Sequence, residues 1–196
     1  MGNHHKEIKK KAAKKRLQEE SIMSRYGLRF DDTMMAVGII LECVSVSQVA
    51  YFAIQQTDAF CRACVGLDVP LFSQTMSRPC IQPICPLYDT PRMTDWTDAL
   101  IATSTSTCLE ALATRSSVII HYVWWPDFLD RRDLDHAEIA RAFTDPRVTV
   151  VVRGEDYREL IETEFGIQVI GEAIPDFNLD QLFGILLPLM RGRENV

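Results

Sequence analysis

Residues 98–129 read DALIATSTSTCLEALATRSSVIIHYVWWPDFL, and this stretch decides the fold class. Ala99–Ala102 and Val118–Val123 are continuous apolar runs, which is typical of strands buried on both faces of a parallel sheet. Between them, Thr107 and Glu110 have capping-box spacing, which predicts a helix from Thr107 to about Arg115. A strand, a hydroxyl-rich turn, a helix and a second strand make half of a nucleotide-type α/β domain.

The same alternation continues on both sides of this stretch. Strands are expected at Met34–Leu41, Asp68–Gln74, Arg147–Val152 and Gln168–Ile170, with a short extended piece at Cys80–Cys85. Helices are expected from Ser45 or Ser47 to Gly66, from Asp135 to Phe143, from Glu155 to Phe165, and from Asn178 to Met190. Strands that alternate with helices predict a Rossmann-like, three-layer α/β domain with a mostly parallel sheet.

Composition indicates a globular chain with a sizeable core. The 196 residues are 47% hydrophobic and 24% charged, which fits one domain over residues 33–196. No apolar run approaches the length of a membrane span, and the N-terminus is too polar for a secretory signal. We therefore expect a cytoplasmic protein without a membrane partner.

Residues 1–32 form a basic, partly helical arm in this interpretation. The first 20 residues hold seven Lys or Arg and three Glu, which gives them a net charge of +4. Because the whole chain has a net charge of −6, the remaining residues carry −10. Such an arm can attract a polyanion, which makes it a candidate DNA contact. A solubilising tail is the alternative. The basic residues proposed to meet DNA are Lys9, Lys10, Lys11, Lys14, Lys15 and Arg16.

The cysteine spacing permits a zinc site but does not favour one. Cys61 and Cys64 form a CxxC, and Cys80 and Cys85 follow as a Cx4C. The first pair falls on the apolar face of a helix and the second in a proline-rich segment, so we expect free buried thiols and no metal.

Asp127 is the candidate catalytic residue. It follows the strand Val118–Val123 and lies next to Trp124 and Trp125, so partial desolvation should raise the pKa of its carboxyl group enough for it to serve as a base. The alternative is that Pro126-Asp127 is only a turn and the tryptophans only cover the core. The free N–H groups at the start of the following helix and the hydroxyls of Thr103, Ser104, Thr105 and Ser106 are expected to face the same ligand crevice. These four residues, with Trp124 and Trp125, are predicted to bind the substrate.

The order of these segments resembles that of phage DNA glycosyltransferases that modify hydroxymethylcytosine, namely the β-glucosyltransferases and their arabinosyl-transferring relatives. The resemblance rests on the order and spacing of AVGII (36–40), SVSQVAYF (45–52), DALIATSTST (98–107), SVIIHYVWWPDF (117–128), RVTVVVRG (147–154) and QVIGEAI (168–174). It covers roughly residues 34–180.

The resemblance implies the N-terminal half of a two-domain GT-B fold, in which this half faces the DNA and the other holds a UDP-sugar. It implies that Asp127 is the general base and that Gln48, with Ser45 and Ser47, contacts the sugar. It implies a UDP-sugar as donor and no tightly bound cofactor. Because the second half would start near residue 196, we expect donor binding in one domain, in a homodimer, or with a second subunit.

The resemblance therefore implies a glycosyltransferase that moves a sugar from a UDP-sugar to hydroxymethylcytosine in DNA. Two alternatives stay open. The first is a non-catalytic α/β module that binds a nucleotide or a partner protein, and the second is a small nucleotide- or nucleoside-processing enzyme.

Overall fold

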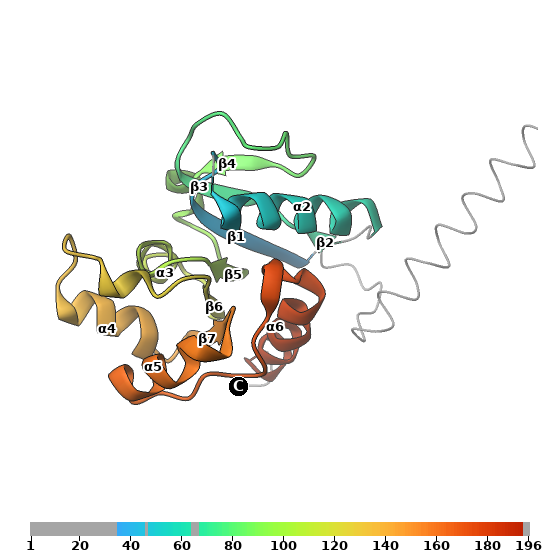
Figure 1. The fold of residues 1–196 in the computed structure, drawn as a ribbon. Helices are drawn as coiled ribbons and strands as arrows, with labels where there is room; N and C mark the ends of the chain where they lie inside the picture. Colours follow the sequence, from blue (N-terminus) through green and yellow to red (C-terminus); the bar gives the residue numbers. More distant parts are fainter. Residues whose placement is uncertain (1–34, 46, 64–66, 194–196) are drawn as a thin grey trace, which may run out of the picture.

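The computed structural model describes residues 35–45, 47–63 and 67–193 (Figure 1). The predicted basic arm, residues 1–32, and the predicted start of the domain near Thr33 lie outside the described residues.

The described residues form one parallel sheet in the order β4-β3-β1-β5-β6-β7, with β2 paired to β1. The strands are β1 (Met35–Cys43), β2 (Leu67–Asp68), β3 (Leu71–Thr75), β4 (Leu87–Asp89), β5 (Ala99–Ala102), β6 (Ile119–Val123) and β7 (Val148–Val152). Leaving out the two-residue β2, this is the strand order 3-2-1-4-5-6 of nucleotide-binding Rossmann folds. The predicted fold class is confirmed.

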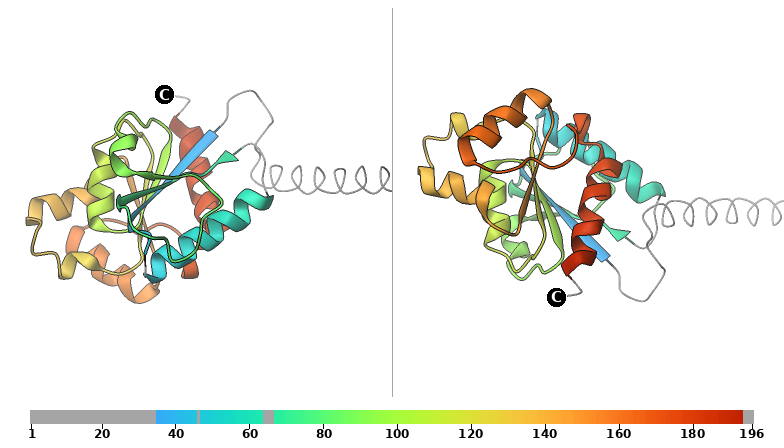
Figure 2. Two further views of the ribbon diagram at one scale, coloured as in Figure 1. Left: turned by 90° about the horizontal axis from the view of Figure 1, so that it is seen from above. Right: turned by 90° about the horizontal axis from the view of Figure 1, so that it is seen from below.

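Helices cover both faces of the sheet, as the two rotated views show (Figure 2). One face carries α2 (Gln48–Ala63) and α6 (Leu179–Arg193), and the other carries α3 (Thr105–Leu112), α4 (His136–Thr144) and α5 (Glu155–Phe165). Three short 3-10 turns, η1 (Thr90–Met93), η2 (Asp127–Leu129) and η3 (Pro175–Phe177), connect these elements.

The core consists of two apolar layers, one on each side of the sheet. Residues of the central strands alternate between them, so that Ile39 packs towards α2 and α6 while its neighbour Ile40 packs towards α3 and α4. Both side chains are fully buried. This double burial explains why the strands are continuous apolar runs in the sequence.

The predicted extended piece at Cys80–Cys85 is wrong, because the edge strand is β4, two residues further on. In this proline-rich segment, two main-chain N–H groups find their acceptor on a helix instead of a strand. Ile84 N–H and Cys85 N–H donate to Asp58 Oδ1 of α2, at 2.8 and 3.4 Å. A buried carboxylate thus replaces the strand ladder that prolines would interrupt.

The predicted strand at Gln168–Ile170 is also wrong. This segment runs along β7, with Ile170 N–H donating to Val150 O and Ile174 N–H to Val152 O, but it forms no strand. The two donors are four residues apart and their acceptors only two, so the residues between them cannot continue a regular ladder.

The predicted strand Asp68–Gln74 is divided in two. β2 ends at Asp68 and β3 begins at Leu71, and Pro70 lies between them. Proline has no N–H to donate, although its carbonyl still accepts from Ile39 N–H at 3.0 Å.

In the described part of the chain, no helix is both long and apolar enough to cross a membrane.

Candidate functional site at the carboxyl edge of the sheet

The carboxyl ends of all the parallel strands meet at one edge of the sheet, and the direction of winding reverses between β1 and β5. A crevice outside the strand ends at such a point is where open α/β sheets bind ligands. A cavity of about 150 Å³ lies there. It is lined by Glu42, Cys43, Ser47, Val49, Thr103, Ser104, Trp124, Trp125 and Asp127.

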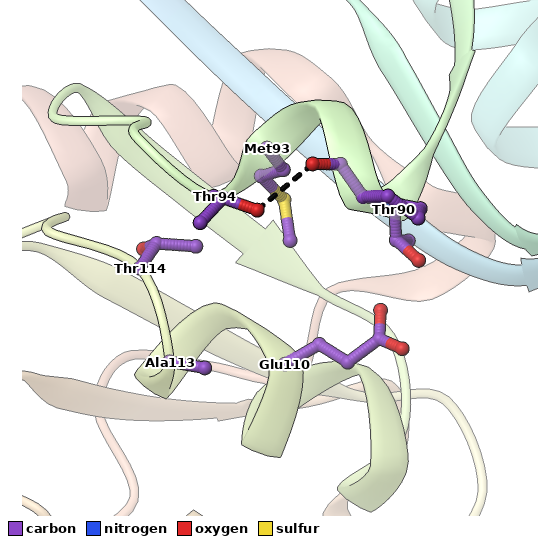
Figure 3. A pocket seen from close by; sticks show the side chains of 7 residues that line it. Thr90, Met93, Thr94, Glu110, Ala113 and Thr114 are labelled. Atoms are coloured by element: carbon purple, nitrogen blue, oxygen red, sulfur yellow. Dashed lines mark hydrogen bonds between the residues drawn. The ribbon is translucent and has the colours of Figure 1, made fainter.

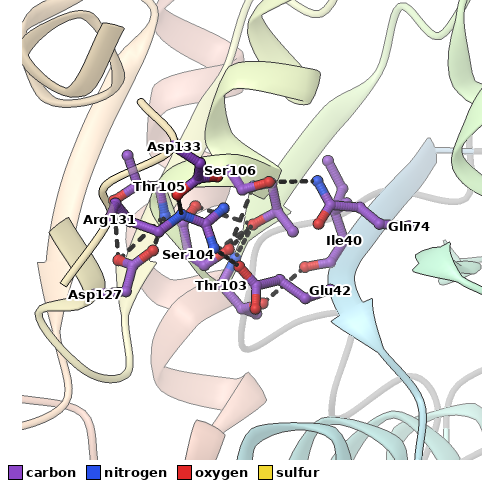
Figure 4. A network of polar contacts seen from close by, with 11 residues as sticks. Ile40, Glu42, Gln74, Thr103, Ser104, Thr105, Ser106, Asp127, Arg131 and Asp133 are labelled. Carbon is purple, nitrogen blue, oxygen red and sulfur yellow. Dashed lines mark hydrogen bonds and ion pairs between the residues drawn. The ribbon is translucent and has the colours of Figure 1, made fainter. Parts of the chain in front are cut away.

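The turn after β5 is held by its own hydroxyl groups. Thr103 Oγ1 donates to Ile40 O of β1 at 2.9 Å, which ties the ends of the two central strands together (Figure 4). Ser104 caps α3, since its Oγ accepts from Thr107 N–H and Thr107 Oγ1 accepts from Ser104 N–H. The predicted start of this helix at Thr107 is therefore wrong. Thr107 is the third helical residue, and it completes a capping box that begins at Ser104.

Asp127 lies in η2, directly after β6, and reaches across to the first turn of α3. Its Oδ2 accepts from Thr105 N–H at 3.0 Å, and its Oδ1 accepts from Thr105 Oγ1 at 2.9 Å (Figure 4). The carboxylate thus takes the position that an anionic ligand would have at the start of the helix. The prediction that free N–H groups of this helix face the crevice is wrong for Thr105.

Burial raises the pKa of the Asp127 carboxyl group above its ordinary value of 3.8. The two hydrogen bonds from Thr105 and the positive charge of Arg131 act in the opposite direction but do not outweigh the loss of solvent. Asp127 therefore lines the cavity with fixed geometry and with a greater affinity for a proton than an exposed aspartate.

A second carboxylate, Glu42, also lines the cavity, and an arginine outside the lining, Arg131, binds it; neither residue was predicted from the sequence. Arg131, from the loop after η2, donates to Glu42 Oε1 at 2.9 Å, and its Nε lies 3.5 Å from Asp133 Oδ1 (Figure 4). Glu42 lies at the carboxyl end of β1, so a search of strand ends would have found it. Arg131 carries no such signal, because its place depends on a contact 89 residues away along the chain.

The two tryptophans have different surroundings. Trp124 is 8% exposed and packs against Phe52 and Tyr122, which fits the alternative that it covers the core. Trp125 is 53% exposed, contacts the Tyr157 ring edge to face, and leaves much of its indole open at the rim of the cavity. Only Trp125 can offer a free aromatic face to a ligand.

The cavity brings together six of the ten predicted site residues, namely Ser47, Thr103, Ser104, Trp124, Trp125 and Asp127. The other four do not line it. Thr105 is fully buried beneath Asp127, and Ser106 Oγ accepts from Gln74 Nε2 at 2.7 Å. Gln48 is an exposed first residue of α2, and Ser45 holds the turn before that helix through a bond from Ser47 N–H to its carbonyl.

A second and larger cavity, of about 230 Å³, lies between η1 and the C-terminal half of α3 (Figure 3). Two of its three hydroxyls are engaged, because Thr94 donates to Pro91 O and Thr114 to Ala111 O. Glu110 brings a buried oxygen without a hydrogen-bond partner, its Oε2. The cavity at the carboxyl edge has the richer chemistry, with two carboxylates, three hydroxyls, a thiol and an open aromatic ring.

The described cysteines are free thiols, while Cys64 lies outside the described residues. Cys85 is buried beside Asp58, and burial with this neighbouring charge raises its pKa to about 12, whereas Cys80 is exposed. Within the described ranges, no three His, Cys, Asp or Glu side chains gather in a way that could hold a metal ion.

Fold and site together define a Rossmann-like α/β domain with a polar, partly aromatic cavity at the reversal point of its sheet. Comparisons of the chain with protein families, with curated proteins and with solved structures found no match.

Proposed function

We propose that this chain is a glycosyltransferase in which Asp127 is the general base. The proposal rests on one observation, a partly buried carboxylate of raised pKa that is held by Thr105 in the wall of a cavity at the carboxyl edge. Such a group can take a proton from a hydroxyl at near-neutral pH. The resemblance to phage DNA glycosyltransferases provides the substrates, a UDP-sugar and hydroxymethylcytosine in DNA.

In this mechanism the proton of the acceptor hydroxyl moves to a carboxylate oxygen of Asp127. The acceptor oxygen forms a bond to the anomeric carbon of the sugar, and the bond from that carbon to the phosphate oxygen breaks, so that UDP leaves with the electron pair. Asp127 Oδ1 accepts from both Thr105 N–H and Thr105 Oγ1, whereas Oδ2 accepts only from Thr105 N–H and keeps a second lone pair, so Oδ2 can accept the proton.

The volume of the cavity limits what it can hold. Pockets for drug-sized ligands measure about 300–1,000 Å³, whereas this one measures about 150 Å³. It therefore suits one sugar-sized or pyrimidine-sized group. Glu42 and Thr103 would bind hydroxyls of that group, the open face of Trp125 would stack on it, and the rest of a nucleotide sugar would extend outside.

The DNA part of the proposal depends on the basic arm. The remainder of the chain carries a net charge of −10 against the arm's +4, so the arm would provide the attraction for a polyanion. A cytoplasmic location belongs to the same proposal, as does completion of the donor site by a second copy or another subunit.

A non-catalytic nucleotide-binding module is the second candidate, and a specific contact favours it. Both oxygens of Asp127 accept hydrogen bonds from Thr105, and these bonds are sufficient for the carboxylate to anchor the start of α3 without any chemical role. In that case the cavity would bind a ligand and Asp127 would have no chemical step to perform.

Sugar transfer from UDP-glucose to hydroxymethylcytosine-containing duplex DNA, followed by mass spectrometry, separates the two candidates. The variant is Asp127→Asn, and the matched control is Asp130→Asn, an exposed aspartate three residues away. We expect transfer by the wild type and the control, and a loss of at least about 100-fold in D127N. Equal rates in D127N, or no transfer by the wild type from any of a panel of UDP-sugars, would reject the catalytic proposal.

A further inference from the structure

Arg153 is held against the wall of the cavity by the register of the sheet. It is the first residue after β7, and its N–H donates to Val123 O of β6 at 3.0 Å. Its guanidinium carbon lies 4.0 Å from the centroid of the Trp124 ring, in a cation–π contact. Because Trp124 also lines the cavity, the cation lies beside the cavity wall, at the edge of the sheet where ligands bind.

Arg153 is a half-buried cation without a counter-ion. Three other arginines in the described ranges are half-buried, and each pairs with a carboxylate: Arg131 with Glu42, Arg147 with Asp145 and Arg158 with Glu155. Arg153 has no ion pair with any described residue, and none of its guanidinium N–H donors binds a described acceptor. None of its nitrogens is both buried and unpartnered, so solvent, and therefore a ligand, can reach them.

The stacking on Trp124 by itself does not account for this arrangement. A cation–π contact engages the face of the guanidinium, whereas its N–H donors point outward in the plane of the group. The contact with Trp124 thus restrains the group and leaves its N–H donors available to a ligand. A planar guanidinium fixed in this way is preorganised for two parallel hydrogen bonds to a phosphate.

We propose that Arg153 binds a phosphate group of the ligand whose sugar-sized part occupies the cavity. The inference rests on the proposed function and adds to it, because a cavity of about 150 Å³ leaves the phosphates of a nucleotide sugar outside, where Arg153 lies. It also assigns the donor phosphate to this domain, where the resemblance to GT-B enzymes places the donor in the other half.

Isothermal titration of the full chain with UDP and with uridine tests this assignment, since the two ligands share the nucleoside and differ in the phosphates. The variants are Arg153→Gln, which removes the charge, and Arg153→Lys, which keeps it. The matched control is Arg132→Gln, which changes an exposed arginine. We expect R153Q to bind UDP roughly 10- to 100-fold more weakly, R153K to recover part of the affinity, and R132Q to match the wild type. Uridine should bind all four proteins equally.

Equal UDP affinity in R153Q and the wild type would overturn the assignment. So would a wild type that binds uridine as tightly as UDP, or one that binds neither. If R153Q does not fold, R153K decides the question through the loss of the planar fork. A wild type that binds UDP through Arg153 but transfers no sugar would remove the proposed function and leave the phosphate site standing. Sugar transfer at the same rate in R153Q and the wild type would remove the phosphate site and leave the proposed function standing.

Discussion

Asp127 anchors the start of α3, and the proposed function gives the same carboxylate a chemical role. Thr105 fixes its carboxylate through an N–H and an O–H donor, and partial burial reduces its contact with water. These two effects shift its pKa in opposite directions, and burial is the larger. The cost of keeping this group ionised in the folded protein must therefore be visible in the stability of the protein.

Replacing Asp127 with Asn should change how stability depends on pH. Because the folded-state pKa is raised above 3.8, the contribution of Asp127 is fully present below the unfolded-state value and is lost as pH rises through the folded-state value. Each unit of the difference is equivalent to about 1.4 kcal/mol. Urea unfolding from about pH 4 to about pH 7 should show the wild type losing stability relative to D127N. A wild type that gains stability relative to D127N over this range would contradict the raised pKa.

Residues with local signals were predictable, and residues placed by distant contacts were not. Asp127 follows a β-branched strand and Ser104 lies in a run of hydroxyls, so the sequence indicated both. Arg131 and Arg153 reach the site through a loop contact and through the register of β6 and β7. No local pattern of residues encodes either relation.

The central strand β1 is packed more tightly than its sequence reveals. A Cβ atom at Gly38 would lie 2.7 Å from Leu100 Cδ2 and 2.9 Å from Phe72 Cε2, closer than carbon atoms can approach. Glycine is therefore required here by its neighbours on β5 and β3.

Gly38→Ala should lower the free energy of unfolding by about 1–3 kcal/mol, because the added methyl group overpacks the core. Gly184→Ala in α6 is the matched control, since a Cβ there meets no atom within 4 Å. That change should stabilise the helix by up to about 1 kcal/mol. Urea unfolding of both variants measures the difference, and equal effects would show that the contacts at Gly38 are not limiting.

Most elements were predictable because they bury apolar residues at regular spacing. β5 occupies the predicted residues Ala99–Ala102, and α5 ends at Gly166, which has a φ of 63° as a glycine C-cap requires. The errors at Cys80–Cys85 and Gln168–Ile170 lie in segments whose main chain is held by Asp58 or by isolated bonds to β7. Such bonds produce no periodic pattern of apolar residues in the sequence.

At the scale of the molecule, the arrangement of the strands brings the residues of the candidate site together. Four strands end at the cavity region and contribute Glu42, Thr103, Trp124 and Arg153, residues that are up to 111 positions apart in the numbering. The alternation of strands and helices predicted the three layers, but the strand order depends on which strands pair. The reversal point between β1 and β5 therefore became visible only in the structure.

The measurement that tests the central claim most directly is the thermal stability of the full chain with UDP-sugars. A ligand that binds only the folded state at a hundredfold excess over its Kd adds about 2.7 kcal/mol of stability. We predict such a gain for the wild type. We predict no gain for Val49→Phe, because Val49 lines the cavity and the larger phenylalanine side chain would fill it. No gain for the wild type with any UDP-sugar, or an equal gain in the Val49 variant, would contradict a nucleotide-sugar site at the carboxyl edge of this sheet.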